Sequence, residues 1–172
     1  LLGRDMQNLN IGIVGFGNVG KKVAKRLKAF GSKIYIFEKR KINKRYKKVG
    51  SLNKLIKISN VLTFHVPLNK RTLKMIREKQ IRKMKKNTLI INTSRAQIVD
   101  SKAILKHRKK IIYVTDLLDK EPPLDTKSSA NKYSNKLLKK DNIFVTPHMA
   151  ASTLDSQEKI SQFLSKKIIK FF

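Results

Sequence analysis

The sequence predicts a doubly wound α/β fold, in which helices cover both faces of a parallel β-sheet as three α/β/α layers. Short apolar runs alternate with segments whose apolar residues recur at helical spacing, from residue 11 to the end of the chain. Several runs are almost continuously apolar, which is typical of strands buried on both faces of a parallel sheet. The 172 residues contain no internal repeat and no clear boundary, so we expect a single domain over residues 1–172.

The first apolar run, residues 11–14, leads directly into a glycine-rich turn that reads Gly15-Phe16-Gly17-Asn18-Val19-Gly20. A helix is expected next, because Val23 and Leu27 continue an apolar pattern of helical spacing. Gly31 stands where a helix C-terminus favours a left-handed residue. A second strand over residues 34–37 then ends at the acidic Glu38.

Each part of this unit has a physical role in holding a dinucleotide. Gly15 permits the tight turn, Gly17 lets the backbone approach a pyrophosphate, and Gly20 allows close packing of helix against strand. The helix N-terminus offers free N–H groups and a positive dipole to the phosphates. Glu38, 18 residues after Gly20, stands where a carboxylate accepts hydrogen bonds from the ribose hydroxyls. The alternatives are a glycine turn that binds no nucleotide, or one that binds S-adenosylmethionine.

The rest of the chain continues the alternation. Residues 39–48 form a solvated basic stretch, and Ser51 is expected to cap a short helix that carries Leu52, Leu55 and Ile56. The elements expected after it are a strand over 61–66 stopped by Pro67, a short helix around 78–84, a strand over 89–91, a helix over 101–107, a strand over 111–115, a long polar loop over 117–141 and a last strand over 143–146.

The chain ends in a predicted amphipathic helix. Ser152, followed three residues later by Asp155, is the pattern of a capping box. Apolar residues at helical spacing place one apolar face on this helix; they are Ile160, Phe163, Leu164, Ile168 and Phe171.

The net charge of +30, from 41 basic and 11 acidic residues, indicates either a nucleic-acid binder or compositional drift. The basic residues fall in nearly every segment, and no run of basic residues interleaved with aromatic ones occurs. We therefore expect no specific nucleic-acid partner, with non-specific polyanion binding as a side effect.

The sequence lacks the features that mark membrane proteins, secreted proteins and proteins with cysteine metal sites. No apolar run approaches the ~20 residues of a membrane span, and no signal peptide precedes the first strand, so no membrane partner is expected. Zero cysteines exclude disulfides and cysteine metal sites, and no metal site is predicted. The lack of cysteine suits a cytoplasmic location.

Polar side chains follow the predicted strands, where ligands bind in an open parallel sheet. Arg95 offers a forked pair of donors suited to a carboxylate, and His148 can carry a proton near neutral pH. Glu121 could hydrogen-bond that imidazole and stabilise its charged form. Each alone is an ordinary surface residue, but together at successive strand ends they predict a catalytic site.

Four ordered segments resemble the nucleotide-binding domain of the D-isomer-specific 2-hydroxyacid dehydrogenases: GIVGFGNVGKKVAKRLKAFG, HVPLNKRTLKMI, INTSRAQIVD, and DLLDKEPP with VTPHMAAST. The resemblance implies that Arg95 binds the substrate carboxylate and carbonyl, that His148 donates and accepts a proton, and that Glu121 orients His148. It implies cofactor contacts from Asn18, Val19, Glu38, Val66, Pro67, Thr93, Ser94, Asp116 and Ala150. It also implies that the family's substrate-binding domain lies outside this chain.

The implied activity is NAD-dependent interconversion of a D-2-hydroxyacid and its 2-oxoacid by a homodimer. Glu38 should repel the 2′-phosphate of NADP and so favour NAD, although Lys39 and Arg40 beside it could accept that phosphate. Ala96 stands where the family usually has glycine, and an alanine there can strain the turn that positions Arg95. A non-catalytic NAD-binding or sensor module is the alternative.

Overall fold

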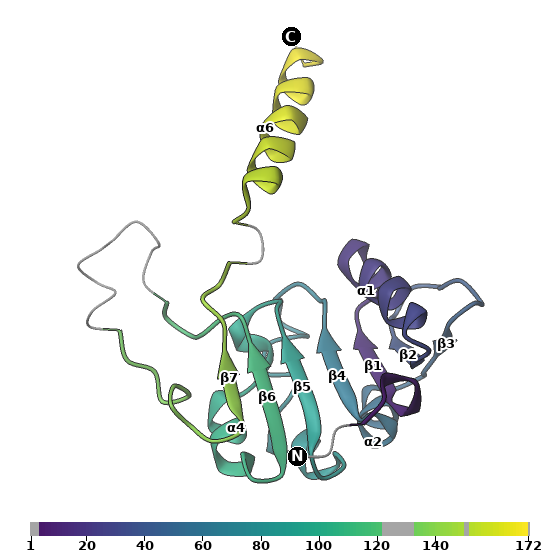
Figure 1. Ribbon diagram of the computed structural model, residues 1–172, viewed down its shortest axis with the longest axis vertical. Helices are drawn as coiled ribbons and strands as arrows, with labels where there is room; N and C mark the ends of the chain where they lie inside the picture. The colour runs from purple at the N-terminus through teal and green to yellow at the C-terminus, as the bar shows by residue number, and fades with distance from the viewer. Residues whose placement is uncertain (1–3, 122–132, 150–151, 172) are drawn as a thin grey trace.

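The fold is that of a computed structural model, which describes residues 4–121, 133–149 and 152–171. In these residues seven strands form one parallel sheet in the order β3-β2-β1-β4-β5-β6-β7 (Figure 1). The strands are β1 Asn10–Val14, β2 Lys33–Phe37, β3 Lys47–Lys48, β4 Val61–Phe64, β5 Thr88–Asn92, β6 Ile111–Thr115 and β7 Ile143–Val145. This confirms the predicted doubly wound α/β class.

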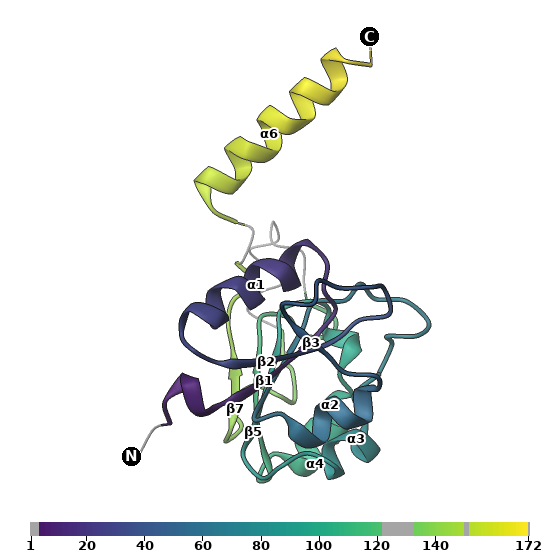
Figure 2. The same cartoon turned by 90° about the vertical axis from the view of Figure 1, so that its right-hand side faces the viewer.

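Helices lie on both sides of the sheet (Figure 2). Helix α1 (Asn18–Ala29) lies on one side, and α2 (Leu52–Ile58), α3 (Glu78–Arg82) and α4 (Ser101–His107) lie on the other. Short 3₁₀ turns occur at η1 (Met6–Asn8) and η2 (Ala96–Ile98). The chain moves outward from β1 to β2 and β3, then returns to place β4 on the other side of β1. The resulting switch point between β1 and β4 is where ligands bind in folds of this class.

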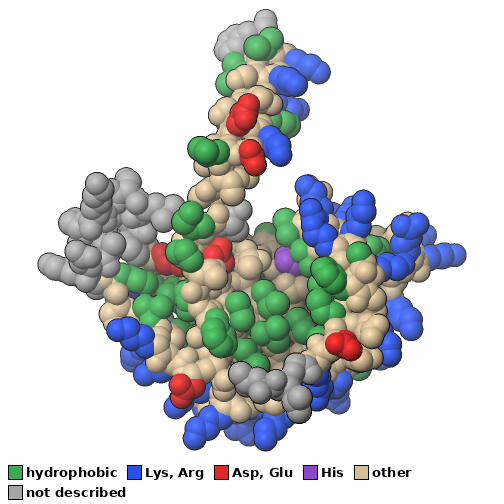
Figure 3. Space-filling model, in the orientation of Figure 1, with side chains coloured by type: hydrophobic (Ala, Val, Ile, Leu, Met, Phe, Trp, Pro, Cys, Tyr) green, Lys and Arg blue, Asp and Glu red, His purple; other side chains and the backbone are tan. Residues whose placement is uncertain are grey.

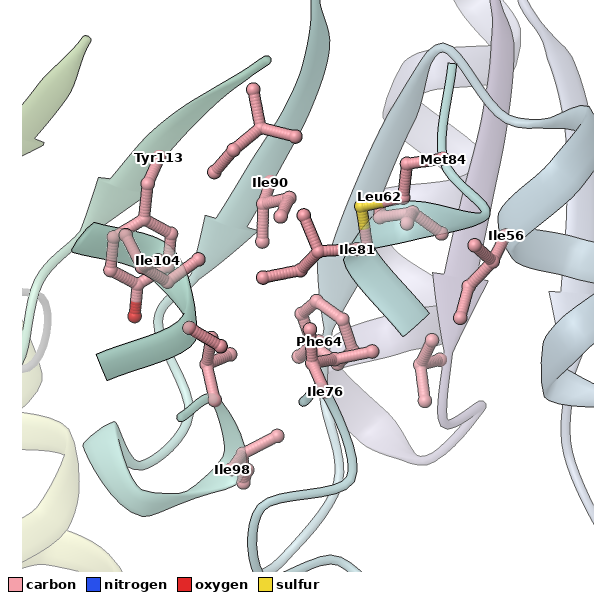
Figure 4. Packing of buried hydrophobic residues seen from close by; sticks show 14 of the residues in the cluster. Ile56, Leu62, Phe64, Ile76, Ile81, Met84, Ile90, Ile98, Ile104 and Tyr113 are labelled. Carbon is pink, nitrogen blue, oxygen red and sulfur yellow. The ribbon is translucent and has the colours of Figure 1, made fainter. Parts of the chain in front are cut away.

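Two hydrophobic clusters hold these layers together. The larger lies between the sheet and α2–α4, with Leu62, Phe64 and Ile90 from the strands and Ile81 and Ile104 from the helices (Figure 4). The smaller packs β1 and β2 against α1 and includes Phe16 and Ala24. Alternation along β5 and β6 points every second side chain at the larger cluster, so the core side of the sheet is specified by the sequence pattern.

The last helix, α6 (Leu154–Ile169), extends away from the sheet in both views (Figures 1 and 2). None of its residues is buried, and its apolar face is open. The predicted cap at Ser152 is wrong by one residue, because the helix begins at Leu154 and the residue that precedes it is Thr153. Thr153 caps instead, and its hydroxyl accepts from the Ser156 N–H at 3.1 Å. Among the described helices, none is long and apolar enough to cross a membrane.

The larger cluster predicts that truncating two different phenylalanines will change the free energy of unfolding by very different amounts. Phe64 is fully buried in β4, whereas Phe163 on α6 is 61 % exposed. Phe64→Ala should lower the free energy of unfolding by about 3–5 kcal/mol, because it leaves a cavity in the core. Phe163→Ala should change it by no more than about 0.5 kcal/mol when the protein is diluted to the monomer. Urea denaturation followed by circular dichroism measures both, and equal losses would contradict the assigned core.

Candidate functional site at the carboxyl edge of the sheet

The turn between β1 and α1 depends on close backbone contacts. Gly15 has φ +91°, and a Cβ there would lie 2.5 Å from the His65 carbonyl oxygen. A Cβ on Gly20 would lie 2.3 Å from the Gly15 carbonyl oxygen. Side chains at either position would push β4 or α1 away from the turn. A Cβ on Gly17, by contrast, would meet nothing within 4 Å, so this glycine faces open space.

The N-terminus of α1 is left open for a ligand. Gly17 is its N-cap residue and supplies no side-chain hydrogen bond, and no acidic residue lies in the first turn. The first N–H groups of a helix have no partner within the helix. Together with the helix dipole, they make this end suited to an anionic group.

A cleft runs along this edge in two connected parts. One hollow, of about 860 Å³, is lined by Gly15, Gly17, Glu38, Val66 and Pro67 among others. The next, of about 440 Å³, is lined by Gly17, Asn18, Val19, His65, Val66, Pro67, Leu68, Thr93, Ser94 and Arg95. They share Gly17, His65, Val66 and Pro67, so the two hollows adjoin, and most of the residues predicted to contact a dinucleotide line one or the other.

Glu38 is bound to the glycine turn itself. Its Oε2 accepts from the Phe16 N–H at 2.9 Å, and its Oε1 accepts from the Arg40 N–H at 3.1 Å. Burial alone raises the pKa of Glu38, but these two N–H groups and the Arg40 guanidinium outweigh it and hold the pKa below the ordinary 4.5. The carboxylate is therefore ionised at neutral pH, with lone pairs left for further donors.

The floor of the second hollow is built by hydrogen bonds between strand ends. Ser94 Oγ donates to the Val66 carbonyl at 2.6 Å, which joins the loop after β5 to the loop after β4. The fully buried Asn92 accepts from the Ser94 N–H at 3.2 Å and donates to the Arg95 carbonyl at 2.9 Å. Asn92 was not among the predicted site residues, although a single amide at the end of an apolar run is a signal for it.

Arg95 lies in the second hollow with an extended backbone, and its Nη1 donates to the Ser94 carbonyl at 2.7 Å. The next residue, Ala96, begins the 3₁₀ turn η2 and is buried. Ala96 is absent from the non-glycine residues with positive φ in the described chain. The expected strain at this alanine is therefore wrong, because the turn needs no left-handed residue at that position.

Glu121 and His148 lie next to each other although 27 residues separate them. The Nδ1 atom of His148 is 2.7 Å from Oε2 of Glu121, and Oε1 accepts from the Leu118 N–H. His148 has φ +52°, a left-handed backbone that is unfavourable for a residue with a side chain. A carboxylate that anchors one ring nitrogen leaves the other nitrogen available for proton transfer.

The structure does not bring all predicted residues into contact. Glu121, His148 and Asp116 line neither hollow, and no hydrogen bond links Arg95 to His148 in the described residues. Asp116 is buried at the end of β6 and accepts from the Thr146 hydroxyl. Ala150 lies outside the described residues. In the described chain, no group of three His, Cys, Asp or Glu side chains could hold a metal ion.

Comparison with known proteins identifies relatives over the whole chain. Residues 1–150 match the model of the D-isomer specific 2-hydroxyacid dehydrogenase, NAD binding domain. Glyoxylate reductase from Thermococcus litoralis is 33% identical over 99% of this chain and 51% of its own length. Hydroxypyruvate reductase from Thermotoga maritima is 34% identical over 99% of this chain and 55% of its own.

Solved structures agree with these relatives. D-lactate dehydrogenase from Aquifex aeolicus, complexed with NAD and lactic acid, superposes with a TM-score of 0.87 and 33% identity over 99% of this chain and 55% of that one. The chain thus spans about half the length of the proteins it matches. It belongs to the D-isomer specific 2-hydroxyacid dehydrogenase family, and the part of the family that it matches is the NAD-binding domain.

Proposed function

We propose that this chain is the cofactor-binding part of an oxidoreductase that interconverts a D-2-hydroxyacid and its 2-oxoacid with NAD. The observation that carries the proposal is the Glu121–His148 pair, 2.7 Å apart, at the same sheet edge as a cleft suited to a dinucleotide. The cleft fits NAD in chemistry, since it combines an uncapped helix N-terminus with an ionised carboxylate. The relatives are named as reductases and dehydrogenases of small 2-oxoacids and 2-hydroxyacids.

In this proposal the helix N-terminus at Asn18 and Val19 holds the pyrophosphate, and Glu38 binds the adenosine ribose hydroxyls. Val66 and Pro67 line the adenosine side, which agrees with their place in the larger hollow. Thr93, Ser94 and Asp116 would contact the nicotinamide, and Ala150, outside the described residues, would contact its carboxamide. Two of these positions follow neighbouring strands: Ser94 comes after β5 and Asp116 after β6.

Bound NAD would supply the hydride acceptor and donor. Arg95 binds the substrate carboxylate through its guanidinium and polarises the neighbouring carbonyl. His148 exchanges a proton with the substrate 2-oxygen through the ring nitrogen that Glu121 does not bind. Glu121 is held in turn by the Leu118 N–H, so the orientation of the imidazole is set by the backbone after β6.

A second candidate is an NAD-binding or sensor module without turnover. Two observations favour it: the Arg95 guanidinium is bonded to its own loop, and neither Glu121 nor His148 lines the cleft. Both candidates require NAD binding, and only the first requires proton transfer.

A homodimer and a cytoplasmic location remain predictions. The open apolar face of α6, with Ile160, Phe163 and Leu164 about half exposed or more, supports association with a second copy. Phe163→Asp should then convert a dimer to a monomer in sedimentation equilibrium, because a buried charge in an apolar interface is costly. A monomer before the substitution would contradict the dimer. The location rests on the absence of cysteine alone.

Two substitutions distinguish the two candidate functions. In the full-length protein, His148→Ala and Arg95→Gln should each lower NADH-dependent reduction of glyoxylate, hydroxypyruvate and pyruvate by about 10²–10⁴-fold, because proton transfer or carbonyl polarisation is lost. NADH binding, followed by its fluorescence, should stay within a few-fold. Arg4→Gln, at an exposed arginine outside the site, is the matched control and should have no effect. Binding without turnover in the unmodified protein would favour the sensor module.

Glu38 should set the choice between NAD and NADP. Glu38→Gln removes the charge that repels a 2′-phosphate, so the ratio of NADP to NAD dissociation constants should fall about tenfold. Because the pKa of Glu38 lies below 4.5, the carboxylate stays charged until the pH falls through that lowered value. Glu38 should therefore contribute its full repulsion at neutral pH and lose it only as the pH falls through that lowered pKa. Glu158→Gln, at an exposed position on α6, is the control, and a ratio unchanged in Glu38→Gln would overturn the assignment.

A further inference from the structure

Two fully buried polar side chains end the core-facing sides of β5 and β6. Ile90 and Tyr113 face the larger cluster, and two residues further along each strand come Asn92 and Thr115, both 0% exposed. The residues that alternate with them point to the other face of the sheet, over which Figure 3 shows hydrophobic side chains gathered. Because a buried polar group costs free energy unless it is hydrogen-bonded, the role of Asn92 and Thr115 lies in the bonds that they make.

The amide of Asn92 holds the loop that carries Arg95. Its oxygen accepts from the Ser94 N–H at 3.2 Å, and its nitrogen donates to the Arg95 carbonyl at 2.9 Å. One side chain therefore fixes the backbone of Arg95 relative to the end of β5. Asn92 is not among the described residues that line the cofactor cleft, so any effect on the cleft passes through this loop.

The hydroxyl of Thr115 joins the end of β5 to the loop after β6. Thr115 is the register partner of Asn92 in the parallel pairing of the two strands. Its Oγ1 lies 3.0 Å from the Asn92 carbonyl oxygen and 2.8 Å from the Leu117 carbonyl oxygen, and it accepts from the Leu117 N–H at 3.2 Å. A hydroxyl has one proton to donate, so both carbonyls draw on it and the two loops are held close together.

The same hydrogen bonds continue to both members of the proposed proton-transfer pair. The loop after β6 supplies the N–H that donates to Glu121. On the other side, the Thr115 carbonyl accepts from the Thr146 N–H at 3.0 Å, and the Thr146 carbonyl accepts from the His148 N–H at 3.0 Å. Successive bonds across the ends of β5, β6 and β7 thus lead from the loop of Arg95 to His148.

We propose that Asn92 and Thr115 are positioning residues that set the separation of Arg95 and His148. The inference rests on the oxidoreductase function proposed above, in which Arg95 binds the substrate carboxylate and His148 exchanges a proton with the 2-oxygen. Both groups must meet one small substrate at the same time, and a misplacement of about 1 Å can cost about 10²-fold in rate. Among the described residues no hydrogen bond joins the two groups directly, so the strand ends set their separation.

The alternative role for such residues is to complete backbone hydrogen bonds where a strand ends, which stabilises the fold without affecting a reaction. Thr88 has that role at the opposite end of β5, where it is 1% exposed and its hydroxyl donates to the Lys85 carbonyl at 2.8 Å. Thr88 and Thr115 match in burial and in bonding, and they differ in the end of the sheet that they occupy. Thr88 is therefore the matched control.

Thr115→Val puts a methyl group where the hydroxyl was. Carbon atoms pack at about 3.5–4.0 Å, so a methyl group cannot stay 2.8 and 3.0 Å from two carbonyl oxygens, and the two loops should move apart. In the full-length protein, kcat/KM for NADH-dependent reduction of glyoxylate, hydroxypyruvate or pyruvate should fall about 10–10²-fold. The affinity for NADH should change much less. Thr115→Ser keeps the hydroxyl and should retain most of the activity, whereas Thr88→Val should lose stability in urea but no activity.

Two further measurements test whether these residues act through Arg95. In an Arg95→Gln background, Thr115→Val should cost much less in kcat/KM than it does alone, because residues that act through one another are not additive. Asn92→Ala leaves the Arg95 carbonyl without its donor and should raise the KM for the oxoacid. Circular dichroism establishes that this variant is folded, and an unchanged KM in the folded variant would contradict the role of Asn92.

Crystal structures of the unmodified full-length protein, Thr115→Val and Thr88→Val give a readout that needs no turnover. The separation of the Arg95 and His148 Cα atoms should change by more than about 0.5 Å, the tolerance of a preorganised site, in Thr115→Val alone. An unchanged separation would overturn the inference, as would equal losses of activity from the two valine substitutions or fully additive losses in the Arg95→Gln background. If the unmodified protein reduces none of the three oxoacids, the proposed function fails, and the crystal structures alone then decide whether Thr115 positions the two groups.

Discussion

The arrangement of this domain depends on one close backbone approach, where the end of β1, the start of α1 and the end of β4 meet. Side-chain carbons at Gly15 or Gly20 would come within 2.5 Å of backbone oxygens, so the approach exists only because both residues lack them. It directs the N-terminus of α1 over the carboxyl edge of the sheet and sets β4 beside β1. The cleft, the place of Glu38 and the neighbourhood of Arg95 all follow from that switch point.

The electrostatics of the cleft are set by one carboxylate among many cations. Among the residues that the structure describes, Glu38 is the only acidic one that lines the larger hollow, beside basic residues such as Lys39, Arg40 and Lys70. These cations attract phosphates in general, and the carboxylate gives the cleft its discrimination at the ribose. Glu38 is held by the Phe16 N–H of the glycine turn itself. The turn that receives the pyrophosphate therefore also orients the group that selects the cofactor.

The proposed proton-transfer pair is held in place by hydrogen bonds to the backbone of the loops that follow the strands. Glu121 and His148 come from the segments after β6 and β7, and each is tied to a nearby backbone group. The left-handed backbone at His148 costs on the order of 1–3 kcal/mol, which neighbouring contacts must offset. Strained residues of this kind gather at functional sites, which agrees with the role proposed for His148.

The sequence by itself determined the local structure: α4 over 101–107 and β6 over 111–115 lie where their periodicity and capping residues placed them. It also determined the family, because glycine turns and ordered motifs are local patterns. The tertiary structure alone decided that Ser94 bonds to Val66, that Ala96 is unstrained, and that Thr153 rather than Ser152 caps α6. The contact between Ser94 and Val66 joins residues 28 apart in the chain, and the turn geometries depend on surrounding packing. Composition and periodicity encode which element a residue belongs to, but not which distant surface it meets.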